Sequence, residues 1–323
     1  MMKELIKKLI PYADIPLLPF VYLSALLMKT IRKIGIKRLP RCREVLMKIG
    51  VFPISDHYYE PQFDNRKLVK SISFDRQLPG INWNKEGQLK FLKCLIFSDE
   101  IINIDHGVNN DVRLGGRFQF NNGSFESVDA EYWYQIIRYL KPKRIIEIGS
   151  GNSTKLAIEA IKKNIEENSA YYCDHICIEP YEQPWLEKAN VKLHRQKVED
   201  MDVRFFAQLE PGDILFIDSS HVIRPGGDVL KEYLEILPSL KSGVIVHIHD
   251  IFSPKNYLRE WLIEDVKFWN EQYILEAFLT NNHQWKILGA LNFLHHNYYN
   301  ELKKVAPHLS ESREPGSFYI VKN

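Results

Sequence analysis

Short apolar runs alternate with helical segments from about residue 127 onward, and this alternation constrains the fold more than any other feature. Parallel strands buried on both faces produce such runs, and each needs a crossover helix before the next. Two later runs have no long helix between them, so the last strand is predicted to be antiparallel. The pattern therefore predicts an α/β, doubly wound sheet of seven strands. The runs cover 144–148, 175–178, 191–194, 213–218, 243–248, 285–293 and 317–321.

A glycine turn follows the first run, where residues 147–154 read EIGSGNST. Glycines let a ligand approach the backbone closely, and the N-terminus of the next helix attracts a carboxylate or phosphate. A dinucleotide site needs a third glycine where Thr154 stands, which counts against NAD. The alternative is a nucleoside cofactor such as S-adenosylmethionine. The predicted cofactor residues of this turn are Glu147, Gly149, Ser150, Gly151, Ser153 and Thr154.

Glu179 ends the second run, 28 residues after Gly151. An acidic side chain at this place can accept hydrogen bonds from both ribose hydroxyls of a bound nucleoside. The alternative is a solvated strand end. We expect Glu179 to bind ribose, because the glycine turn lies at the right distance from it.

The chain resembles class I S-adenosylmethionine-dependent methyltransferases over roughly residues 127–323. The stretches GDILFIDSSH, GGD and GVIVHIHD are similar to the branch of macrolide-sugar and, more distantly, catechol O-methyltransferases. The resemblance implies a Rossmann-like sheet of order 3-2-1-4-5-7-6 with the seventh strand antiparallel. It also implies that Glu147, Gly149 and Gly151 line the methionine end of the cofactor. Asp200 and its neighbour Glu199 are implied beside adenine.

The fourth and fifth runs end in polar residues, Asp218 and the pair His249-Asp250. The carboxyl ends of neighbouring parallel strands open onto one crevice, so these side chains are expected to converge. They can hold a divalent ion such as Mg²⁺ or Mn²⁺, and the resembling metal-dependent enzymes place ligands at these strand ends. A histidine ligand, His249, shifts the preference from magnesium toward manganese, iron or zinc. Asp218 is also expected to contribute to the cofactor site.

His221 lies three residues after Asp218, at a spacing where the resembling sugar methyltransferases place a general base. An imidazole has a pKa near neutral pH and can take a proton from a substrate hydroxyl. The alternative is a histidine that caps the loop. His247 and His249 share one face of their strand, and His249 is predicted to be the catalytic or metal-bound one of the two.

Residues 257–279 are predicted to form one helix, and four aromatic residues are spaced along it. Two readings stay open for their i, i+4 pairs, Tyr257/Trp261 and Trp269/Tyr273. They can pack in the core, or they can form the floor of an acceptor pocket, since aromatic faces suit sugar rings.

The first fifty residues are apolar and basic. Residues 9–28 carry one charged side chain, Asp14, and residues 1–50 have a net charge of +8, against −6 for the remainder. Each basic residue adds ~1 kcal/mol of attraction to an anionic membrane surface. Three interpretations stay open: a segment lying on the membrane surface through residues 9–43, a helix packed on the protein, or a true span. Three prolines argue against one straight spanning helix.

The predicted organisation has three parts, which are residues 1–50, a connector and helical cap over 51–126, and a methyltransferase domain over 127–323. Within the cap, a helix is expected near 84–103 and a hairpin or flexible loop near 113–125. A net charge of +2 gives no sign of nucleic-acid binding, and four cysteines are too few for a disulfide framework. We expect a cytoplasmic protein, on the inner face of the membrane where the surface segment attaches, and a homo-oligomer is compatible with the sequence.

The expected reaction is transfer of a methyl group from S-adenosylmethionine to a hydroxyl of a small molecule or glycan, with His221 as the base. Three alternatives stay open. An NAD-dependent enzyme would share the sheet, and an Fe(II) oxygenase would use His221, His249 and Asp218. A non-catalytic module bound to a membrane would need none of these side chains.

Overall fold

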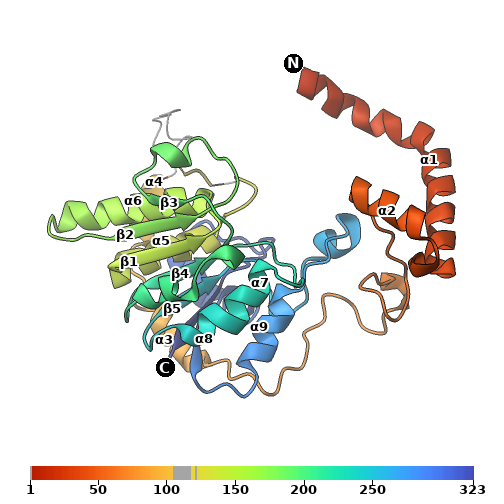
Figure 1. Cartoon of the computed structure of the whole chain (residues 1–323). Coiled ribbons are helices and arrows are strands. Elements are labelled where there is room, and N and C mark those ends of the chain that lie inside the picture. The colour runs from red at the N-terminus through yellow and green to blue at the C-terminus, as the bar shows by residue number, and fades with distance from the viewer. Residues whose placement is uncertain (1, 105–117, 121) are drawn as a thin grey trace. The chain divides into compact units, whose positions relative to one another are not determined.

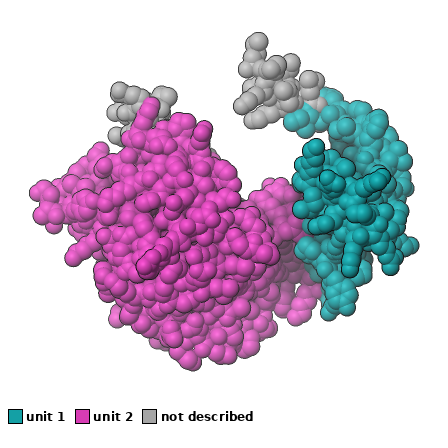
Figure 2. All heavy atoms as spheres, in the orientation of Figure 1, with its two compact units in different colours: residues 1–69 teal, residues 70–323 magenta. Residues whose placement is uncertain are grey.

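The computed structural model describes residues 2–104, 118–120 and 122–323, and it divides the chain into two compact units. The first unit covers residues 1–69 and the second covers residues 70–323 (Figure 2). The division falls at residue 69, which is neither of the domain boundaries predicted near 50 and 126. Those two boundaries stay predictions.

Helix α1 (Met2–Ile34) makes up half of the first unit. Three prolines lie within its bounds without ending it, and Figure 1 shows the helix bent. A proline inside a helix removes one backbone hydrogen bond and kinks the axis, which accounts for such a bend. The elements that follow α1 in this unit are η1 (Ile36–Arg38), α2 (Pro40–Ile49) and η2 (Asn65–Lys67).

The second unit is built on the predicted sheet (Figure 1). In the described residues seven strands pair in the order β3-β2-β1-β4-β5-β7-β6, and β7 is antiparallel to both of its neighbours. The predicted fold class, strand order and antiparallel seventh strand are therefore confirmed. The strands are β1 (Arg144–Ile148), β2 (Asp174–Ile178), β3 (Lys192–His194), β4 (Ile214–Ile217), β5 (Ile245–Ile248), β6 (Trp285–Ala290) and β7 (Phe318–Lys322).

Helices fill the connections of the sheet. Helix α5 packs along α6 and places the buried Trp133 ring 5.3 Å from the ring of Phe216 on β4. The helices and helical turns of the second unit are α3 (Lys85–Leu92), α4 (Ser98–Ile104), α5 (Asp129–Leu140), α6 (Asn152–Glu167), η4 (Leu186–Lys188), η5 (Val198–Asp200), η6 (Val203–Gln208), α7 (Asp228–Lys231), η7 (Glu232–Ile236), α8 (Leu237–Ser239), η8 (Glu260–Glu264), α9 (Glu271–Leu279), α10 (Leu291–Asn297) and α11 (Tyr299–Val305).

Two predicted elements are wrong in extent. The helix expected over 84–103 is two helices, α3 and α4, and the long helix expected over 257–279 is the short turn η8 followed by α9. Val266 lies between η8 and α9 with a φ of 55°. This left-handed conformation is costly for a β-branched residue and cannot continue an α-helix. Six of the thirteen residues of the hairpin or loop expected near 113–125 lie outside the described residues, and the other seven form no strand.

A buried guanidinium joins three helices at one end of the sheet. The side chain of Arg138 on α5 is fully buried, and its Nε donates to Glu100 Oε2 of α4 over 2.8 Å. Glu167 at the end of α6 pairs with the same guanidinium. Burial raises the pKa of Glu100, but hydrogen bonds from Arg138 and Tyr134 hold that pKa below its usual value.

Glu100→Gln is expected to lower the free energy of unfolding at pH 7 by about 1 kcal/mol, because a partly exposed, charge-assisted hydrogen bond is lost. A depressed pKa stabilises the fold above the unfolded pKa near 4.5 and loses that effect as the pH falls through the lower folded pKa. The difference between variant and wild type should therefore shrink below about pH 4. Urea denaturation from pH 3 to 7 checks this, with Glu166→Gln, an exposed partner of Lys163, as the control.

Candidate active site

The register of the four central parallel strands places four predicted site residues in one row. Ile148 pairs with Ile178 and Ile217, and Ile217 pairs with Ile248. The residue after each of these positions begins a loop at the same edge of the sheet. Those residues are Gly149, Glu179, Asp218 and His249.

Backbone hydrogen bonds continue one step beyond the strands and fix this row. The Gly149 amide donates to Ile178 O over 3.0 Å, and the Asp218 amide donates to Ile148 O over 2.9 Å. The His249 amide donates to Ile217 O over 2.9 Å. The side chains at the edge are therefore placed by the sheet itself.

A pocket of about 260 Å³ opens at this edge, between the first and fourth strands and the loops that follow them. Three of the predicted cofactor residues line it, namely Gly149, Glu179 and Asp218. Sequence reasoning missed most of the other walls, because they come from loops with no motif of their own. These walls are Ile148, Ile178, Pro180, Tyr181, Lys197, Val198, Glu199, Ser219, Ser220, Arg224 and Asp228.

Gly149 meets the Asp218 backbone so closely that no other residue fits there. Its φ is +83°, and a Cβ at this position would lie 2.1 Å from the Asp218 carbonyl oxygen. Glycine is therefore required on two grounds, conformation and space. The turn brings the backbone of Gly149 to the wall of the pocket.

Glu179 is 7% exposed, and its carboxylate is held against the glycine turn. Its Oε2 accepts from the Ser150 amide over 3.2 Å, and its Oε1 accepts from the Tyr181 amide over 2.9 Å. The carboxylate is thus fixed at the pocket wall rather than pointing into bulk water, as the ribose hypothesis requires.

Four other predicted cofactor residues lie beneath or beside the turn and do not line the pocket. Glu147 is fully buried, and its Oε2 accepts from Ser153 Oγ over 3.1 Å and from Thr154 Oγ1 over 2.9 Å. The Gly151 amide donates to Thr154 Oγ1 over 3.1 Å. In the structure these residues therefore support the glycine turn from beneath through hydrogen bonds. A direct contact with cofactor stays a prediction.

His175, which is not among the predicted site residues, completes this support. Its Nε2 lies 2.5 Å from Glu147 Oε1, and both side chains are buried. Ser150 contributes its backbone to the turn, and its buried Oγ has no partner among the described atoms. Asp200 is exposed and lies outside the pocket lining, whereas its neighbour Glu199 lies in that lining.

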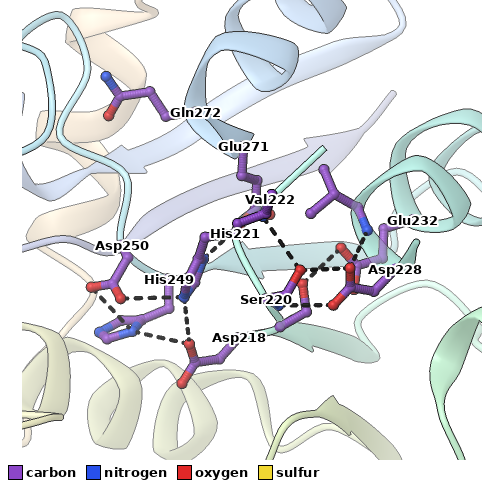
Figure 3. A network of polar contacts seen from close by, with 12 residues as sticks. Asp218, Ser220, His221, Val222, Asp228, Glu232, His249, Asp250, Glu271 and Gln272 are labelled. Carbon is purple, nitrogen blue, oxygen red and sulfur yellow. Dashed lines mark hydrogen bonds and ion pairs between the residues drawn. The ribbon is translucent and has the colours of Figure 1, made fainter. Parts of the chain in front are cut away.

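A cluster of two carboxylates and two imidazoles adjoins the pocket (Figure 3). His221 Nε2 lies 3.2 Å from Asp218 Oδ1 and 3.3 Å from Asp250 Oδ2. His249 Nδ1 lies 3.6 Å from Asp218 Oδ1 and 3.5 Å from Asp250 Oδ1. The structure therefore brings together all four residues that the sequence assigned to catalysis and metal binding.

Charge balance within the cluster shifts every pKa. Burial lowers the pKa of His249, but Asp250 and Asp218 raise it to about 10. Burial also lowers the pKa of His221, yet the surrounding carboxylates bring it well above its usual value. Burial raises the pKa of Asp218, and the two imidazoles more than reverse this, so that it lies below its usual value. Asp250 differs, because burial outweighs the imidazoles and raises its pKa.

Glu271 is a functional candidate that sequence reasoning missed. It is fully buried at the start of α9, and its Oε2 lies 2.7 Å from His221 Nδ1, as Figure 3 shows. The amides of Asn270 and Glu271 also donate to the His221 carbonyl oxygen, over 2.9 and 3.2 Å. One helix end therefore holds both the ring and the backbone of His221. No spacing in the sequence links residues 50 positions apart, and Glu271 fell inside the wrongly extended helix.

Several donor atoms of the cluster are arranged as a metal site requires. Single ligand atoms of Asp218, His221 and Asp250 all lie within 4.8 Å of one another. The predicted set of Asp218, His249 and Asp250 shares two of these residues, and both imidazoles face the same pair of carboxylates. His247, by contrast, is fully buried beneath the site, with Nε2 2.8 Å from Ser317 Oγ.

Fold and site together match one class of protein. A family model described as a methyltransferase domain matches residues 146–251, which span the glycine turn, Glu179 and the whole cluster up to Asp250. The chain is thus an S-adenosylmethionine-dependent methyltransferase with a Rossmann-like domain. This match favours the methyltransferase over the NAD-dependent enzyme, the Fe(II) oxygenase and the non-catalytic module.

The chain also matches an uncharacterized protein of Archaeoglobus fulgidus. The two are 33% identical over 204 residues, which cover 58% of this chain and 87% of the archaeal protein. The chain belongs to the same family as that protein.

Solved structures of methyltransferases are similar to the chain at low sequence identity. One is the O-methyltransferase TomG of Streptomyces achromogenes in complex with SAM, at 12% identity, covering 72% of this chain and 90% of that one with a TM-score of 0.40. Another is an O-methyltransferase of Bacillus cereus in complex with SAH, also at 12% identity, covering 72% of this chain and all of that one with a TM-score of 0.40.

Gly149→Ala is expected to weaken S-adenosylmethionine binding by at least roughly tenfold, about 1.4 kcal/mol, because the added methyl group displaces the Asp218 backbone at the pocket wall. Isothermal titration calorimetry measures the affinity. Gly212→Ala is the matched control, since Gly212 has a φ of +88° with nothing near its added methyl group. Equal affinities in the two variants would contradict the assignment of Gly149 to the pocket.

Proposed function

We propose that the chain is an O-methyltransferase that acts on a hydroxyl group of a small molecule or glycan. The observation that carries the proposal is the buried Glu271–His221 pair beside the cofactor pocket. Glu271 engages Nδ1 of the imidazole, so that Nε2 is the nitrogen directed at Asp218 and Asp250. This arrangement orients one ring nitrogen for proton transfer, as a general base requires.

In the proposed reaction the acceptor hydroxyl oxygen attacks the methyl carbon of the sulfonium. The bond from carbon to sulfur breaks as the bond from oxygen to carbon forms, and the electron pair stays on sulfur. His221 Nε2 takes the hydroxyl proton. The products are a methyl ether, S-adenosylhomocysteine and a protonated imidazole, which Glu271 and Asp250 stabilise by charge.

The protonation state that His221 needs as a base supports a bound cation. The carboxylates around His221 raise its pKa, and a protonated imidazole cannot act as a base. Neutralising the Asp218 and Asp250 carboxylates by a divalent ion would lower that pKa again. The donor set fits such an ion, with Asp218, Asp250 and His249 as the proposed ligands and Mg²⁺ or Mn²⁺ as candidates. A bound ion supplies positive charge that lowers the pKa of an acceptor hydroxyl.

The aromatic residues near His221 favour a ring-shaped acceptor such as a sugar. The Trp269 ring lies 4.4 Å from the His221 ring, and the Trp261 ring lies 5.0 Å from Trp269. Both tryptophans are partly exposed, and Lys267 Nζ lies 4.4 Å from each ring centre. Trp261 lies in η8, and Lys267 and Trp269 lie in the loop between η8 and α9. This grouping supports the acceptor-floor reading, although the predicted helical pairs are absent.

His221→Ala is expected to lower kcat by about 10²–10⁴-fold, because general-base catalysis contributes that much. S-adenosylhomocysteine is measured with a panel of sugar and phenolic acceptors in the presence of Mn²⁺ or Mg²⁺. Bound metal is measured in parallel by elemental analysis. Retained metal with lost turnover supports the role as base, whereas loss of metal would make His221 a ligand and contradict that role.

Glu179→Ala is expected to weaken S-adenosylmethionine binding by roughly 10–100-fold, since the proposed bonds to the ribose hydroxyls are lost with the charge. Calorimetry compares it with Glu182→Ala, which removes an exposed carboxylate three residues away. Adenine lacks the ribose, so its affinity should change as little as in the control, whereas methylthioadenosine carries the ribose and should lose affinity as S-adenosylmethionine does. An unchanged affinity for S-adenosylmethionine itself would refute the ribose assignment.

A further inference from the structure

We infer that residues 9–28 of helix α1 are embedded in the hydrocarbon layer of a membrane, with the basic segment 29–43 that follows them at the anionic cytoplasmic face. The observation behind this inference is independent of the catalytic site. The observation is that apolar side chains are exposed on all sides of one continuous helix, which has no polar face. The exposed large apolar residues of α1 from Tyr12 to Leu27 are Tyr12, Ile15, Leu17, Leu18, Phe20, Val21, Tyr22, Leu23, Leu26 and Leu27.

These side chains cover the whole circumference of the helix. At 100° per residue, the run from Ile15 to Met28 points in every direction, and Ser24 is its one polar member. The exposed fractions of the large apolar residues from Tyr12 to Leu27 range from 45% to 78%. A helix lying on a membrane surface has a charged face toward water, which this run lacks. An all-round apolar helix is stable only where apolar material surrounds it.

The dimensions fit a bilayer. The stretch Tyr12–Ile34 has 23 residues and is long and apolar enough to cross a membrane. Its basic end begins at Lys29, and the 20 residues 9–28 before it carry one charged side chain, Asp14. At a rise of about 1.5 Å per residue these 20 residues span roughly 30 Å, about the thickness of the hydrocarbon layer. The prolines at 16 and 19 are tolerated in such helices, because the freed backbone groups can be satisfied by local adjustment.

The charge of the residues after the apolar run favours a membrane over a second protein as the partner of α1. It also indicates which end of the helix lies on the cytoplasmic side. Residues 29–43 hold seven Lys or Arg side chains and no acidic one. In the described part of the chain Arg32 pairs with Glu60, and no ion pair engages the other six. A basic segment next to an apolar helix stays on the cytoplasmic side and is attracted to anionic lipid headgroups. The catalytic unit follows on that same side.

Embedding is tested on the full chain expressed in bacterial cells. We expect the protein in the membrane fraction, resistant to extraction with carbonate at pH 11 and with 1 M salt (roughly the condition that screens surface charge completely). The double variant Leu18→Asp/Leu23→Asp should appear in the soluble fraction with its affinity for S-adenosylmethionine unchanged. The matched control is Val69→Asp, which adds a charge at a fully exposed valine outside the helix.

Three outcomes would overturn the inference. Release by salt or carbonate would show attachment by charge at the surface, and a soluble wild-type protein would show a helix covered by protein. Loss of α1 from the mature chain, read by intact mass, would show a cleaved targeting segment. The orientation is tested with a membrane-impermeant maleimide, which should label the exposed Cys42 in broken but not in intact cells, with Cys42→Ser as the control.

Discussion

The site depends on the hydrogen-bonded register of four parallel strands. Amides of Gly149, Asp218 and His249 each donate to the neighbouring strand one residue beyond the regular pairing, so that the strand ends form a level edge. A slip of one residue in any strand would turn its side chains to the other face and remove its contribution to the pocket. The same register explains why glycine is needed at 149, since the Asp218 carbonyl fills the space where a side chain would lie.

Burial of charge is the second organising feature. Asp218, Asp250, His221 and His249 concentrate ionisable groups at the edge of an apolar sheet, where an unpaired charge is costly. Mutual pairing and the contact from Glu271 offset that cost, and the proposed cation would complete the balance. Glu147 and His175 form a second buried pair of ionisable side chains beneath the glycine turn. Both groups of ionisable side chains lie at or beneath the edge of the sheet that carries the pocket, whereas the buried Arg138 pairs lie between the helices.

Much of the fold was predictable because periodicity and turn residues are local. The strands predicted over 144–148, 175–178 and 213–218 follow directly from apolar runs, and the last of them ends one residue earlier than predicted, at Ile217. The site residues at strand ends were predictable for the same reason. Glu271, by contrast, contacts His221 from a helix that begins after Val266, a residue with a positive φ. No local sequence pattern predicts a positive φ at a valine. The roles of Glu147, Ser153 and Thr154 beneath the turn depended on side-chain directions, which spacing alone does not give.

The first residue of α9 holds His221 by its backbone and its ring, whereas Trp261, Lys267 and Trp269 lie in η8 and the loop between η8 and α9. Under the proposed function, proton handling and acceptor recognition are therefore assigned to separable pieces of chain. Insertions or exchanges between the strand that ends in Ile248 and the first residue of α9 can alter which molecule is accepted while leaving the reactive nitrogen in place. This segment is therefore the natural target for redesigning the acceptor preference of the proposed enzyme.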